Sequence, residues 1–72
     1  MDSFGTLEGR QDYTIHGELY ARLFFTVDGD PENIIQCQLP SDAFDTDVKV
    51  GDKIRITRLM STVMEIRKQS DA

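Results

Sequence analysis

The sequence predicts a small all-β domain of five short strands curled into a barrel, and three observations support that prediction. Apolar and polar residues alternate through most of the chain with the period of two that is typical of strands with one buried face. The segments between these runs are rich in Gly, Asp, Asn and Pro, the residues that favour tight turns. The length, 72 residues, suffices for one domain with one core. We therefore expect a single domain over residues 1–72.

The first strand is expected over residues 4–15, FGTLEGRQDYTI. Gly5 and Gly9 are positions where such a strand would bend or bulge, so we expect it to be curved. The residues expected to face the core are Leu7, Tyr13 and Ile15.

The clearest strand covers residues 19–27, LYARLFFTV. Every odd position in it is apolar, so alternation directs Leu19, Ala21, Leu23, Phe25 and Val27 to the core. The other face of the strand then carries Tyr20, Arg22, Phe24 and Thr26.

The third strand is expected over residues 34–39, after a turn at residues 28–33, with Ile35, Cys37 and Leu39 facing inward. It should end at Pro40. Ser41 is a good N-cap, so residues 41–44 predict one short helical turn that places Phe44 against the end of the barrel.

The fourth strand is expected over residues 53–57, with Ile54 and Ile56 facing inward. Strict alternation would point Arg58 into the core, so we expect a bulge or the end of the strand near Thr57. The fifth strand should cover residues 63–68, with Met64 and Ile66 inward. Residues 69–72 form a polar tail that we expect to be disordered.

The segment at residues 48–57, VKVGDKIRIT, is similar to the turn that leads into the fourth strand of many oligonucleotide/oligosaccharide-binding (OB) folds. The predicted order of elements, with a short helix between strands three and four, resembles the same fold, a five-stranded, partly open barrel. SH3-like barrels and small molybdate-binding barrels also contain such turns, so they remain alternatives. No specific family is identified.

The resemblance implies that a ligand lies across the outer face of the second and third strands. Mapped onto this sequence, that face consists of Tyr20, Arg22, Phe24, Ile34, Gln36 and Gln38. Lys53, Arg55 and Arg58, with Arg67 and Lys68, belong to the fourth and fifth strands and would contribute only if they shared that face.

The charge is unevenly distributed along the chain. The net charge is −5, which argues against a protein that coats nucleic acid non-specifically. Residues 1–47 carry a net charge of −8, whereas residues 48–72 carry +3. A locally basic strip could bind a few phosphates, although charged outer faces of strands also serve solubility and edge protection.

Two functional hypotheses follow from this face. In the first, Tyr20, Arg22 and Phe24 stack on the bases of single-stranded DNA or RNA, with help from Lys53 and Arg55. In the second, Tyr20, Phe24 and Ile34 form an apolar patch for a protein partner or for a second copy of the chain. A multimeric barrel that binds a small molecule or oxyanion is a third hypothesis, although the sequence contains no clear anion nest.

The sequence predicts a binding module and not an enzyme. It contains no catalytic motif, Gly-rich phosphate loop or metal-ligand spacing, so we expect no catalytic residue, no metal and no cofactor. His16 is the only histidine, and Cys37, the only cysteine, should act as a small core residue. Residues 1–4 lack the pattern of a signal peptide, and no apolar run approaches a membrane span. We therefore expect a cytoplasmic protein.

Overall fold

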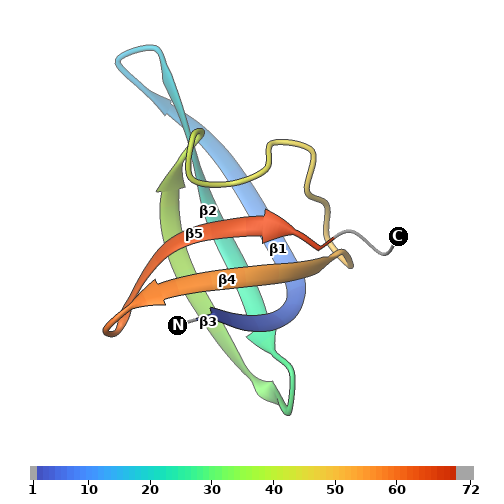
Figure 1. The fold of residues 1–72 in the computed structure, drawn as a ribbon. Coiled ribbons are helices and arrows are strands. Elements are labelled where there is room, and N and C mark those ends of the chain that lie inside the picture. Colours follow the sequence, from blue (N-terminus) through green and yellow to red (C-terminus); the bar gives the residue numbers. More distant parts are fainter. Residues whose placement is uncertain (1, 70–72) are drawn as a thin grey trace.

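The computed structural model describes residues 2–69, which form one five-stranded antiparallel sheet (Figure 1). The strands lie in the order β3-β2-β1-β4-β5, and these residues contain no helix. The all-β prediction and the five predicted strands are confirmed. The strands are β1 (Asp2–Ile15), β2 (Glu18–Val27), β3 (Asp30–Pro40), β4 (Lys53–Leu59) and β5 (Thr62–Lys68).

The sheet curls but does not close into a barrel. β1 joins the two halves of the sheet, because Gly5 pairs with Val27 of β2 and with Ile54 of β4. β3 and β5 are the two edge strands, and no ladder connects them. The physical reason is that the loop after β3 forms backbone hydrogen bonds with the edge of β5 that a closed barrel would pair with β3. The Ile66 N–H donates to Ala43 O at 3.0 Å, and the Asp45 N–H donates to Ile66 O at 3.3 Å.

The helical turn predicted at residues 41–44 is not formed. The Ala43 N–H donates to Pro40 O at 2.9 Å, which closes a single β-turn, and the chain then forms a parallel bridge between Phe44 and Ile66. The backbone groups that would extend a helix are thus bonded to β5. The expected position of Phe44 is nevertheless correct, because its side chain is only 1% exposed and belongs to the core.

The core lies inside the curl of the sheet and contains the inward-facing residues expected from β2 and β4. Leu23, Phe25, Ile54 and Ile56 are fully buried. The turn before β4 has the expected form, with Gly51 at φ +95° and the Lys49 N–H donating to the Asp52 carboxylate at 2.9 Å. The remaining core residues are Leu7, Ala21, Leu39, Phe44, Val48 and Ile66.

Bulges change which residues of β1 and β5 face the core. In β1, Leu7 pairs with Phe25 and Gly9 with Phe24, so Glu8 is an extra residue and the alternation reverses after it. Tyr13 consequently lies half-buried on the outer face and Ile15 is exposed, although both were expected inside.

In β5 the extra residue is Met64, because Thr57 pairs with Glu65 and Arg58 with Val63. Met64 is therefore 48% exposed, and Val63 packs against the core in its place. The irregularity expected near Thr57 is confirmed.

The hairpin between β2 and β3 is tighter than predicted. Only Asp28 and Gly29 form the turn, with Gly29 at φ +90°, and residues 30–33 already belong to β3. Pro31 is compatible with this strand because β3 is at the edge of the sheet, where a missing N–H need not break a ladder.

The predicted tail mostly lies outside the described residues. Gln69, which is described, donates its backbone N–H to Lys53 O at 2.8 Å. Within residues 2–69, no helix is long and apolar enough to cross a membrane.

Candidate binding surface

The outer face of β1, β2 and β3 brings together three cross-strand rows, which we call the aromatic–amide face. Tyr20, Arg22 and Phe24 stand in the middle strand, and each pairs with a residue of β1 and a residue of β3. Ile34, which is 63% exposed, lies two residues beyond the third row. The rows are Tyr13–Tyr20–Pro40, Gln11–Arg22–Gln38 and Gly9–Phe24–Gln36.

Two tyrosines stack at the hairpin end of this face. The ring centroids of Tyr13 and Tyr20 are 5.8 Å apart and their planes differ by 14°. The Tyr20 hydroxyl donates to the Glu18 carboxylate at 3.4 Å. Tyr13 was not expected here, because the bulge at Glu8 is what moves it to the outer face. In the sequence, only Gly9, which follows this bulge, indicated that the alternation of β1 would be interrupted here.

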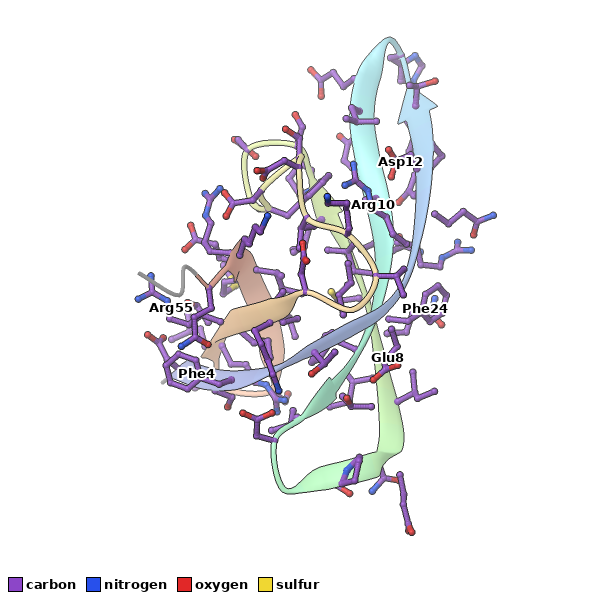
Figure 2. The ribbon with its side chains drawn as sticks, turned by 90° about the vertical axis from the view of Figure 1, so that its right-hand side faces the viewer. Phe4, Glu8, Arg10, Asp12, Phe24 and Arg55 are labelled. Carbon is purple, nitrogen blue, oxygen red and sulfur yellow. The ribbon has the colours of Figure 1, made fainter. Side chains whose placement is uncertain are left out.

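The Phe24 ring lies directly over Gly9. A Cβ at Gly9 would be only 3.2 Å from Cδ1 of Phe24, so the absence of a side chain leaves room for the ring. Phe24 is therefore half-buried and held against the sheet. Figure 2 shows its side chain on the outside of the molecule, with Glu8 nearby.

Arg22 is the cation of the aromatic–amide face, and its partner is neutral. Its Nη1 donates to Gln11 Oε1 at 3.2 Å. Among the described residues Arg22 forms no ion pair, and its buried Nε has no hydrogen-bond acceptor. A ligand that offers an oxygen to this guanidinium would gain a charge-assisted hydrogen bond without breaking an ion pair.

The basic residues of β4 and β5 do not converge on the aromatic–amide face. Arg55 pairs in register with Phe4 of β1 on one side and with Arg67 of β5 on the other. Figure 2 shows Phe4 and Arg55 together on the opposite side of the molecule from Phe24. The help that Tyr20 and Phe24 were expected to receive from Lys53 and Arg55 is therefore absent from this arrangement.

Most of these cations also have carboxylate partners. Lys53 Nζ is 3.7 Å from Asp28, and Arg55 Nε is 3.9 Å from Asp2. Lys68 Nζ is 3.7 Å from Asp52. These pairs offset the positive charge that the sequence places in residues 48–72.

Arg67 forms the tightest of these contacts. Its guanidinium donates to Glu65 and Asp45, each at 3.1 Å, and to the Asp42 carbonyl at 2.9 Å. The hydrogen bonds to Glu65 and then Asp45 raise the pKa of Arg67. Arg67 thus joins β5 to the loop that follows β3.

Arg58 is separate from the other cations. It pairs with Val63 beyond the β5 bulge and lines a shallow pocket with Ser3, Leu59 and Met60. We therefore place Arg58 outside the aromatic–amide face.

Arg10, which was not singled out from the sequence, holds the long loop against the sheet. Its Nη1 donates to the carbonyls of Thr46 and Val48, each at 2.8 Å, and its Nε pairs with Asp12 at 2.7 Å. Its guanidinium also lies 5.3 Å from the centroid of the Phe44 ring. Figure 2 shows Arg10 and Asp12 beside the loop. These contacts give Arg10 a structural role.

The Cys37 thiol provides a pH-dependent prediction. Burial raises the pKa of Cys37 from 9.0 to about 11. Between pH 9 and pH 11 the unfolded chain loses the thiol proton while the folded protein retains it. The contribution of the Cys37 thiol to the free energy of unfolding is therefore fully present below pH 9 and is lost as the pH rises through 11. We expect the urea midpoint of the wild type to fall more between pH 9 and pH 11 than that of Cys37→Ala. Equal falls in the two proteins would contradict this prediction.

Within residues 2–69, no group of three or more His, Cys, Asp or Glu side chains is placed to hold a metal ion. Comparisons of the chain with family models, curated proteins and solved structures found no match.

Proposed function

We propose that this domain is a non-enzymatic binding module that holds a protein partner on the aromatic–amide face. The observation that supports this is the composition of the face, which combines three aromatic rings, several amides and one cation without a carboxylate partner. Tyr, Phe and Arg are enriched at protein interfaces.

Charge suggests the chemistry of that partner. Glu8 and Glu18 lie at the margins of the face, and residues 1–47 carry a net charge of −8. A partner with an apolar centre and Lys or Arg residues around it would be attracted electrostatically to this surface. A second copy of the chain is less well matched, because two acidic surfaces repel each other.

Single-stranded nucleic acid is the second candidate ligand for the same face. The Tyr13–Tyr20 pair and Phe24 are surfaces on which bases could stack, each contact contributing about 1–3 kcal/mol. Arg22 alone would neutralise about one phosphate, so such binding should depend only weakly on salt. This small positive charge is why we prefer the protein partner.

The likeness to an OB fold is also a proposal. It is supported by the strand order, in which β1 pairs with both β2 and β4 while β3 and β5 remain at the edges. A five-stranded, partly open barrel has such an opening. The SH3-like and molybdate-binding barrels remain alternatives, and a cytoplasmic location remains a prediction from the sequence.

Site-specific photo-crosslinking in cells that produce the chain would test the protein-binding proposal. We would place benzoylphenylalanine at Gln36, an exposed residue beside Phe24, and in a control at Val50, which is 62% exposed and distant in the fold. We expect a defined adduct from position 36 and none from position 50. The same partner, once purified, should bind Phe24→Ala and Tyr20→Ala at least tenfold more weakly than wild type.

Titration of labelled single-stranded DNA and RNA at two salt concentrations separates the two candidates. Saturable binding that is lost in Phe24→Ala, together with no adduct at position 36, would replace the protein partner with nucleic acid. Circular dichroism should show that both alanine variants remain folded, because both side chains lie on the outer face. Marked unfolding would contradict that placement.

A further inference from the structure

A second group of residues, away from the aromatic–amide face, surrounds a shallow pocket at the ends of β4 and β5. The pocket has a volume of about 320 Å³ and is lined by Phe4, Arg55, Arg67, Lys68 and Gln69. Phe4, Arg55 and Arg67 form one row in register across β1, β4 and β5. Figure 2 shows Phe4 and Arg55 at the same end of the molecule. We call this group the Phe4–Arg55 pocket.

The Arg55–Arg67 pair is unusual for a sheet. Residues directly opposite each other on antiparallel strands have Cβ atoms about 4.5–5.5 Å apart, and like charges in such a pair destabilise the sheet. A sequence that breaks this local rule often does so at a functional site. Asp45 and Glu65, each 3.1 Å from Arg67, already compensate that guanidinium, whereas Arg55 has only a 3.9 Å contact with Asp2. An anion beside Arg55 would therefore gain a contact that the sheet does not supply.

The charged side chains that line the pocket are all cations, although each of them also has a carboxylate partner outside the lining. Three of its five lining residues are Arg or Lys, and none is Asp or Glu. The Arg55–Asp2 and Lys68–Asp52 contacts, at 3.9 and 3.7 Å, join partly exposed side chains, and such pairs are weak. Arg67, by contrast, is held by Asp45, Glu65 and Asp42 and is therefore already positioned. An incoming anion can displace the weak partners while Arg67 stays in place.

Phe4 adds an aromatic surface beside these cations. It is 44% exposed, and its position opposite Arg55 places the ring next to the charged groups. A ring flanked by Arg and Lys suits a ligand that has both a flat π-system and a phosphate. Simple oxyanions would not use the ring, and neutral aromatic compounds would not use the cations.

We propose that the Phe4–Arg55 pocket binds a nucleotide, with the base against Phe4 and the phosphate held by Arg55 and Lys68, beside Arg67. The nucleotide is either free or one residue of a single strand, since the same chemistry would recognise both. This site is independent of the aromatic–amide face and of whatever binds there.

Nuclear magnetic resonance titration of the 15N-labelled protein tests this proposal. Adenosine 5′-monophosphate, a hexathymidylate, adenosine and inorganic phosphate are added separately at low salt. We expect the monophosphate or the hexathymidylate to shift the backbone amides of Phe4, Arg55, Arg67 and Lys68 saturably. Adenosine and phosphate should each bind at least tenfold more weakly. If the monophosphate saturates at the lower concentration, the ligand is a free nucleotide. If the hexathymidylate does, the ligand is one residue of a single strand.

Two variants make the test specific. Arg55→Gln should weaken binding at least tenfold while its thermal midpoint stays close to that of the wild type, because Arg55 is half-exposed and its pair with Asp2 is weak. Lys49→Gln, which removes an exposed cation that lines neither the pocket nor the aromatic–amide face, should bind as the wild type does. The proposal is overturned if neither nucleotide shifts these amides at 10 mM, if phosphate binds as tightly as the monophosphate, or if Arg55→Gln binds unchanged.

Discussion

Gly5→Ala is expected to lower the free energy of unfolding by about 3 kcal/mol or more, enough to leave much of the protein unfolded. Gly5 is buried in β1, at the point where β2 and β4 pair with it from either side. A Cβ at this position would overlap the carbonyl oxygen of Thr26, which is a backbone atom. No side-chain rotation relieves that contact, so one strand must move and hydrogen bonds must be lost.

Urea denaturation followed by far-UV circular dichroism would measure this effect. Gly9→Ala is the matched control, because it is the same substitution in the same strand. There the new Cβ would meet the Phe24 side chain at 3.2 Å, and a side chain can shift slightly. We expect Gly9→Ala to cost about 1 kcal/mol or less. Similar midpoints for the two variants would show that β1 and β2 are not packed this closely at Gly5.

Phe44→Ala is expected to cost about 3–5 kcal/mol, although Phe44 lies in a loop. Its ring is 1% exposed within the core, and the chain on either side of it is bonded to Ile66. Removing the ring leaves a cavity under the segment that occupies the open side of the sheet. A domain of this size has a total stability of roughly 4–11 kcal/mol, so the loss is a large fraction of it.

Phe4→Ala is the control for Phe44→Ala, because it removes the same atoms from a side chain that is 44% exposed. We expect it to change the free energy of unfolding by less than about 1 kcal/mol. A mild effect of Phe44→Ala, comparable with that of Phe4→Ala, would mean that residues 41–52 do not pack on the sheet as described. Hydrogen exchange at Ile66, whose N–H donates to Ala43 O, would report the same detachment locally.

The sequence was most informative where one strand face is wholly apolar. In β2 the odd positions are all apolar, and Ala21, Leu23 and Phe25 are buried as predicted. The same reasoning placed Ile54 and Ile56 correctly, because Gly51 marks the turn before β4. Alternation is a local property of the chain and requires no knowledge of the neighbouring strands.

The prediction failed where a neighbouring strand sets the exact position of a bulge. Irregularities were expected at Gly9 and near Thr57, but nothing in the sequence marks Glu8 and Met64 as the extra residues. One extra residue reverses the alternation of everything beyond it. The first bulge moves Tyr13 outward and Arg10 inward, so it creates half of the tyrosine stack and the contacts that hold the loop.

The sequence by itself therefore determined the all-β class, the five strands, most of the core and the aromatic side chains on the outer face of β2. Only the tertiary structure decided that β3 and β5 remain unpaired with each other and that the cations of β4 and β5 lie away from Phe24. It also brought Phe4, Arg55 and Arg67 into one row. The physical reason is that strand pairing, sheet curvature and bulges depend on contacts between residues far apart in the chain, which local alternation does not encode.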